Sequence, residues 1–159
     1  MRVTWDDTWS EMAQVVAQRS RCCRSKVGAV IVSPTNKVLA TGYNGPPSGW
    51  DNDGYNLFLA NDCEKWCPRG MRGPTAETLT SYEDCPTLHA EMNALMYSDA
   101  SERKDGSIYV TSDLCFTCAK AIANSGIKTV HVVKSGGYDH RNPERSYEFL
   151  AGCGIEVVR

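Results

Sequence analysis

Four residues in two short motifs have the types and spacing of a catalytic metal site. His89 and Glu91 form an H-x-E pair, and Cys115 and Cys118 form a C-x-x-C pair. Zinc favours Cys sulfur and His nitrogen, and a catalytic zinc keeps three protein ligands and one position for water. His89, Cys115 and Cys118 therefore form a candidate set of three ligands.

Glu91 distinguishes a catalytic site from a structural one. Zinc with two thiolates and a neutral imidazole is formally neutral, so it acidifies its water less than an all-histidine site would. A carboxylate in the first helical turn after His89 can accept the water proton without binding the metal. The alternative is that the C-x-x-C is half of a structural zinc site and His89 is a core residue. The two motifs together, each at a predicted helix start, favour catalysis.

Regular elements surround these motifs. Thr4 and Asp7 resemble a capping box before a helix over residues 5 to about 20. Thr87 is expected to cap the helix that carries Glu91 and ends near residue 98. The C-x-x-C begins a helix over 115–126 that Gly126 ends. The other elements are strands at 27–32, 37–43, 107–111, 128–133 and 155–158 and a helix from Pro143.

This alternation of helices and strands predicts one α/β domain over residues 1–159, with helices packed on a central sheet. Residues from about 44 to 86 form an irregular insertion rich in Gly, Pro, Asn and Asp. A segment of that length needs something other than a core to order it. The cysteines within it suggest that a metal does so.

Composition narrows the functional classes. The net charge of −2 and the pI of about 5.9 argue against a large nucleic-acid interface. A local basic cluster could still hold a small anion. The sequence has no apolar run of membrane-spanning length and no apolar segment typical of a signal peptide near its start, which predicts a cytoplasmic protein. Eight cysteines then favour metal binding over disulfides. The basic residues are Arg19, Arg21, Arg24 and Lys26.

The motifs resemble those of the dCMP deaminases in the zinc-dependent cytidine deaminase superfamily. H-x-E with P-C-x-x-C is the signature of zinc nucleobase deaminases, and here Leu114 replaces the proline. "GYNG" is the most discriminating match. The matching stretches are "RSRC" (19–22), "VGAVIV" (27–32), "TGYNGPPSG" (41–49), "CEKWC" (63–67), "HAEMNAL" (89–95), "CAKAIANSGI" (118–127) and "GIEV" (154–157).

The resemblance implies a three-layer α/β/α cytidine-deaminase-like fold with a mixed sheet of about five strands. It also implies hydrolysis of dCMP to dUMP and ammonia, which feeds thymidylate synthesis. Zinc-activated hydroxide would attack C4 of cytosine while Glu91 shuttles the proton. Asn44 would contact the sugar, and the backbone at Ala90 would face the base. Arg24 or Lys26 would bind the phosphate, although a solvated basic turn is an equal alternative.

Relatives suggest further sites and partners. They are homo-oligomers, often hexamers, and many respond to dCTP and dTTP at a second nucleotide site, where Mg²⁺ could accompany dCTP. The loop at 70–84 differs from the usual one, so regulation is left open. A structural zinc at four cysteines is expected, with buried thiols as the alternative and Cys23 as an alternative to Cys22. The regulatory loop would include Gly42, Tyr43, Asn44 and Gly45, and the second zinc would be held by Cys22, Cys63, Cys67 and Cys85.

Three other functions compete with this interpretation. A deaminase of dCTP or of 5-substituted dCMP would use the same chemistry, because the pocket beside C5 and the phosphate contacts decide between them. A tRNA adenosine or riboflavin-pathway deaminase is disfavoured by the acidic pI and by "GYNG". A zinc-stabilised nucleotide-binding module without turnover would have no need of a carboxylate at Glu91.

Overall fold

A computed structural model describes residues 1–22, 24–50, 67–68, 85–133 and 142–159. Cys23, Cys63 and most of the predicted insertion lie outside these ranges, so the predictions made for them stay predictions. The two ends of the insertion meet within the described part of the chain. Gly45 and Leu88 form an isolated antiparallel bridge, in which each residue donates its N–H to the other's carbonyl at 3.2 and 2.8 Å.

A five-stranded mixed sheet forms the centre of the fold, in the order β2-β1-β3-β4-β5. β1 (Gly28–Val32) pairs antiparallel with β2 (Val38–Tyr43) and with β3 (Ser107–Val110). β4 (Thr129–Val132) and β5 (Glu156–Val158) continue the sheet in parallel with β3. All five residues of β1 are buried, which explains its continuous apolar sequence.

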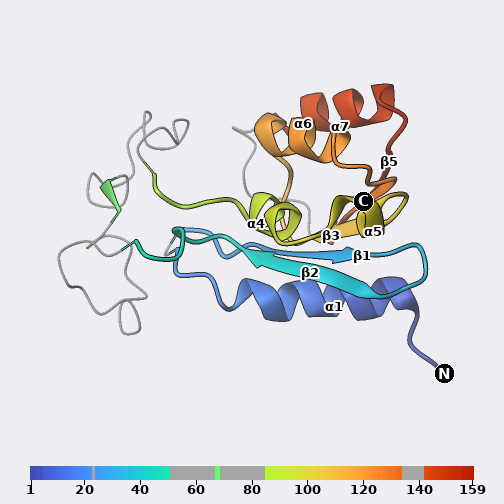
Figure 1. The fold of residues 1–159 in the computed structure, drawn as a ribbon, viewed down its shortest axis with the longest axis horizontal. Coiled ribbons are helices and arrows are strands. Elements are labelled where there is room, and N and C mark those ends of the chain that lie inside the picture. The colour runs from blue at the N-terminus through green and yellow to red at the C-terminus, as the bar shows by residue number, and fades with distance from the viewer. Residues whose placement is uncertain (23, 51–66, 69–84, 134–141) are drawn as a thin grey trace.

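Helices cover both faces of the sheet, which confirms the predicted three-layer α/β/α fold. α1 (Trp5–Ala17) covers one face, and α4 (Ala90–Met96), α6 (Phe116–Ala123) and α7 (Pro143–Gly152) lie on the other (Figure 1). The short α5 (Ala100–Arg103) follows α4. No helix in the described ranges is long and apolar enough to cross a membrane.

Alternate residues of the strands supply two separate cores. On the α1 face, Trp9 and Ala13 pack with Val30, Val32 and Tyr109. The opposite face carries the larger core, where the sheet meets α4, α6 and α7. Its fully buried members include Ala29, Ile31, Ile108, Val110, Leu114, Ile122, Val130 and Leu150.

The predicted elements are all present, with shifted ends. Thr4 caps the helix as predicted, because its Oγ1 accepts the Asp7 N–H at 3.1 Å. The second half of a capping box is replaced, because Asp7 Oδ2 accepts the Thr4 hydroxyl at 2.6 Å instead of the Thr4 N–H, and the helix ends at Ala17. The prediction that Thr87 caps the next helix is wrong. The bridge to Gly45 holds Leu88 in extended backbone, so α4 begins only after His89.

Candidate active site

His89 is held where the bridge ends and α4 begins. It is the N-cap of α4, with extended backbone angles (φ −70°, ψ 152°), and its side chain makes no capping hydrogen bond. The imidazole instead directs Nδ1 toward the start of α6. Nδ1 lies 3.4 Å from the sulfur of Cys115 and 3.3 Å from the sulfur of Cys118.

The two cysteines occupy the first turn of α6. Cys115 is its N-cap, and its sulfur accepts the backbone N–H of Cys118 at 3.4 Å. Cys118, one turn further on, is 1% exposed. The sequence folds this way because Leu114, fully buried in the larger core, anchors the residue before the cap.

The geometry of these three side chains fits a zinc ion. Their ligand atoms all lie within 4.8 Å of one another. Tetrahedral zinc at ordinary bond lengths places nitrogen and sulfur ligands about 3.6 Å apart, close to the two N–S distances here. A half-exposed histidine and two cysteines with soft sulfur ligands suit zinc better than a hard cation.

The protein environment favours the thiolate form of Cys115. The hydrogen bond with Cys118 lowers the pKa of the Cys115 thiol to about 4, and His89 and the Cys118 backbone N–H add to the effect, while burial opposes it. A position at a helix N-terminus acts in the same direction. Thiolate is the form that binds metal, so the site favours the ligand state before a metal arrives.

Glu91 lies in the first turn of α4, two residues after His89, and is 3% exposed. Its helix is fixed against β2 at two points. Asn93 Nδ2 donates to the carbonyl of Tyr43 at 2.8 Å. Gly42 allows contact so close that an added Cβ would lie 2.1 Å from the Ala90 carbonyl oxygen. A buried carboxylate in the first turn of a fixed helix, two residues after a cluster ligand, is suited to proton transfer.

The structure gives each residue of "GYNG" a positioning contact. Gly42 and Tyr43 hold α4, and Gly45 holds Leu88 through the bridge. Asn44, 6% exposed, accepts the Val27 N–H at Oδ1 (2.8 Å) and donates to the Ser25 carbonyl from Nδ2 (2.7 Å). Asn44 thus joins the end of β2 to the segment that precedes β1.

The basic residues divide between two places. Arg24 is half-buried and Lys26 is exposed in the segment that Asn44 holds. Arg19 and Arg21 line a different feature, a cavity of about 700 Å³. Gly42, Tyr43, Gly45, Asn93, Met96 and Tyr97 line the same cavity, together with Leu88 and residues 46–49.

Three of the four cysteines predicted for a second zinc gather in one cluster. Cys67 is buried, and Cys22 and Cys85 pack against it. The Cys67 and Cys85 sulfurs are 3.7 Å apart, close to the ~3.8 Å between two sulfurs on one tetrahedral zinc. Cys63 lies outside the described residues. Among the residues that the structure describes, only His89, Cys115 and Cys118 place three candidate ligand atoms within 4.8 Å of one another.

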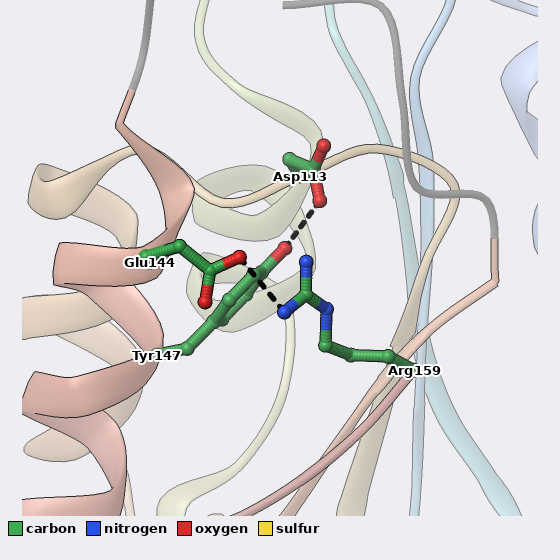
Figure 2. Close-up of polar contacts among 4 residues, drawn as sticks. All are labelled: Asp113, Glu144, Tyr147 and Arg159. Carbon is green, nitrogen blue, oxygen red and sulfur yellow. Dashed lines mark hydrogen bonds and ion pairs between the residues drawn. The ribbon is translucent and has the colours of Figure 1, made fainter. Parts of the chain in front are cut away.

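The sequence analysis missed a buried pair beside the cysteine turn. Tyr147, on α7, donates its hydroxyl hydrogen to Asp113 Oδ1 at 2.5 Å, and the Arg159 guanidinium lies over the Tyr147 ring (Figure 2). Asp113 stands two residues before Cys115, which is a weak signal in the sequence. Tyr147 offers none, because only the packing of α7 on α6 brings it to this turn.

The fold and the His-Cys-Cys-Glu arrangement define the class of zinc-binding deaminases, and comparisons with known proteins agree. The family model for the cytidine and deoxycytidylate deaminase zinc-binding region matches residues 3–134. The chain belongs to this family.

Two phage enzymes are similar along most of their length. The deoxycytidylate deaminase of Mycobacterium phage D29 is 39% identical over 132 residues, covering 81% of this chain and 94% of that protein. The one from Enterobacteria phage T2 is 33% identical over 168 residues, covering 92% of this chain and 87% of that protein. The crystal structure of dCMP deaminase from cyanophage S-TIM5 in complex with dCMP and dUMP is 25% identical, with a TM-score of 0.67 over 99% of this chain and 97% of that one.

Proposed function

We propose that this chain is a zinc-dependent deaminase that hydrolyses dCMP to dUMP and ammonia and so supplies the substrate of thymidylate synthesis. The observation that carries the proposal is the His89–Cys115–Cys118 cluster together with Glu91, which is buried in the first turn of the helix that His89 caps. The similarity to dCMP deaminases over most of the chain supports the choice of nucleotide.

Each site residue takes a distinct role in this proposal. His89, Cys115 and Cys118 hold the zinc and leave the fourth coordination position open. When bound, the zinc supplies a water of lowered pKa as the nucleophile for C4 of cytosine. Glu91 would take one proton of this water and transfer it to N3. It would then take the second proton from the hydroxyl formed at C4 and give it to the amino group, which leaves as ammonia. Atoms balance, because one water replaces one amino group.

Contacts with the rest of the nucleotide are proposed for Asn44, Ala90, Arg24 and Lys26. Ala90 is the first residue of α4 and its side chain packs in the core, so the proposed contact with the base is through its backbone. Asn44 uses one lone pair and one amide hydrogen within the protein, which leaves one of each for the sugar. Lys26 is exposed, and with Arg24 nearby in sequence it would supply the positive charge for the phosphate.

A regulatory nucleotide site is part of the same proposal. Gly42, Tyr43 and Gly45 line the cavity of about 700 Å³ that Arg19 and Arg21 also line. Guanidinium groups beside aromatic rings suit a nucleoside triphosphate, so the candidate effectors are dCTP, with Mg²⁺, and dTTP. A homo-oligomer such as a hexamer would cover the exposed apolar side chains of Met96 and Tyr97 at the same cavity.

The cysteines also support a second zinc and a cellular location. The pair Cys67–Cys85, with Cys22 against it, supports a Cys₄ zinc completed by Cys63. Cysteines engaged in metal sites are typical of a reducing compartment, which favours the cytoplasm. The net charge of −2 favours a small-molecule substrate over a nucleic acid.

The test is a substrate panel with metal analysis. Ammonia release and ultraviolet absorbance are followed with dCMP, dCTP, deoxycytidine and CMP, and zinc is counted per chain. We expect turnover of dCMP to dominate. Preference for dCTP would keep the chemistry and change the substrate, and no turnover of any of the four would support a binding module instead. The variant Glu91→Ala should keep its zinc and lose about 10²–10⁴-fold in kcat, and full activity would refute the proposed proton transfer.

A further inference from the structure

The turn that carries Cys115 lacks the usual restraint of a deaminase signature. Proline before the first cysteine would lock φ near −65° and remove one backbone N–H. With Leu114 at this position, φ is not locked by a ring and the backbone N–H is present. Something else must therefore fix the turn between β3 and α6, because Cys115 at its end is a candidate metal ligand.

The structure attaches this turn to the fold at three points. At its start, Thr111 Oγ1 accepts the Gly28 N–H at 3.0 Å, and the Thr111 N–H donates to the Gly28 carbonyl at 3.0 Å. At its end, the Leu114 side chain is fully buried in the core. Between them, Asp113 accepts the Tyr147 hydroxyl hydrogen at 2.5 Å (Figure 2).

The third attachment is buried and strong. Asp113 and Tyr147 are 7% and 6% exposed, and the distance is that of a charge-assisted O–H···O⁻ bond. Burial raises the pKa of Tyr147 and the Asp113 carboxylate raises it further, so the phenol stays a donor to Asp113.

A charged pair covers the outer side of this contact. The Arg159 guanidinium lies 4.7 Å from the centre of the Tyr147 ring, and its Nη1 is 2.8 Å from Glu144 Oε1 (Figure 2). Both charged side chains are largely exposed. Arg159 and Glu144 shield the ring from water, and neither is joined to the Cys115 turn by an interaction marked in Figure 2. Arg159 is therefore a useful control position.

We propose that Tyr147 is a positioning residue for the metal site: its hydroxyl anchors the Asp113 side chain, and through it the turn, so that the Cys115 sulfur faces His89 and Cys118. The hydrogen bond takes over the restraint that proline gives elsewhere. The described contacts of Tyr147 do not include His89 or Cys118, so Tyr147 acts on the metal site through the turn. The inference rests on the proposed function only where turnover is measured.

The chain contains a matched control on the other face of the sheet. Tyr109 is 3% exposed and donates its hydroxyl to Asp6 Oδ1 at 2.6 Å. The bond has the same chemistry and nearly the same length, but its acceptor Asp6 is exposed, and it joins β3 to α1 instead of to the cysteine turn. Tyr147→Phe should therefore cost more thermal stability than Tyr109→Phe, because its acceptor Asp113 is buried, and the two variants should also differ at the metal.

The experiment replaces zinc by Co²⁺ in the whole protein and compares the wild type with both variants. We expect Tyr147→Phe to shift the visible and thiolate-to-cobalt absorption bands, and Tyr109→Phe to leave them unchanged. Tyr147→Phe should also release zinc to a chelator about tenfold faster and lower kcat by about tenfold, with KM nearly constant, as for other residues that orient metal ligands.

Two outcomes decide the matter. Identical cobalt spectra and zinc-release rates in Tyr147→Phe and Tyr109→Phe would overturn the proposal and leave Tyr147 with a purely structural role. Arg159→Ala keeps the hydroxyl and should keep the wild-type spectrum, so a shift there would show that general loosening of α7, not the hydrogen bond, is responsible. The spectra need no substrate, so absent dCMP turnover would refute the proposed function without touching this inference.

Discussion

Gly42 determines how closely the helix with His89 and Glu91 approaches the sheet. In Gly42→Ala, the new Cβ would lie 2.1 Å from the Ala90 carbonyl oxygen and 2.5 Å from the Ala94 nitrogen. Contacts below 3.0 Å essentially never occur, so α4 and β2 must separate by about 0.9 Å, which moves α4 relative to the rest of the site. Because both obstacles are helix backbone, no side-chain rotation relieves them.

A displacement of this size should be expensive for catalysis and moderate for stability. A shift of about 1 Å in catalytic groups can reduce the rate about 10²-fold. Overpacking a tight contact costs about 1–3 kcal/mol in the free energy of unfolding. We therefore expect Gly42→Ala to fold, to melt at a lower temperature, and to lose about 10²-fold in kcat/KM for dCMP.

Gly106→Ala is the control for this prediction. Its Cβ would lie 2.3 Å from the Val32 carbonyl oxygen and 3.0 Å from the Arg103 carbonyl oxygen, again a clash with backbone. Gly106 lies where Val32 pairs with Ser107, at the end of β3 opposite the one that leads to Cys115. Steady-state kinetics and urea unfolding of both variants test the reasoning. Wild-type kcat/KM in Gly42→Ala, or equal losses of activity in the two variants, would refute it.

Two further predictions concern metal content and pH. Cys67→Ser should lower the zinc content from two ions per chain toward one, measured by elemental analysis of purified protein, and an unchanged count would exclude Cys67 as a ligand. Burial lowers the pKa of His131, which stacks on Tyr109 at 4.2 Å, below its usual 6.5. The unfolded chain then binds the proton first, so stability is lost as the pH falls through 6.5 toward the lower pKa of the folded state. His131→Phe should remove this part of the loss when unfolding is compared at about pH 7.5 and about pH 5.5, whereas parallel changes in both proteins would contradict it.

The sequence by itself indicated the chemistry and the layers. Ligand chemistry is carried by residue type and short spacing, so His89, Glu91 and the two cysteines could be found without coordinates. The layered fold followed from apolar periodicity, because a strand such as β1 that is buried on both faces is a continuous apolar run. The start of α4 could not be placed, since the bridge from Leu88 to Gly45 that delays it joins residues 43 positions apart.

Tertiary structure alone decided how the site is held in place. Gly42 is a glycine because a helix backbone from elsewhere in the chain lies against it, not because of any local turn. Tyr147 meets Asp113 only after α7 has packed on α6, 34 residues from its partner. Such contacts depend on the distance between elements that are remote in sequence, and this distance cannot be predicted from local propensity. The residues that perform the chemistry can therefore be identified from the sequence, while those that fix the geometry of the site can be identified only from the tertiary structure.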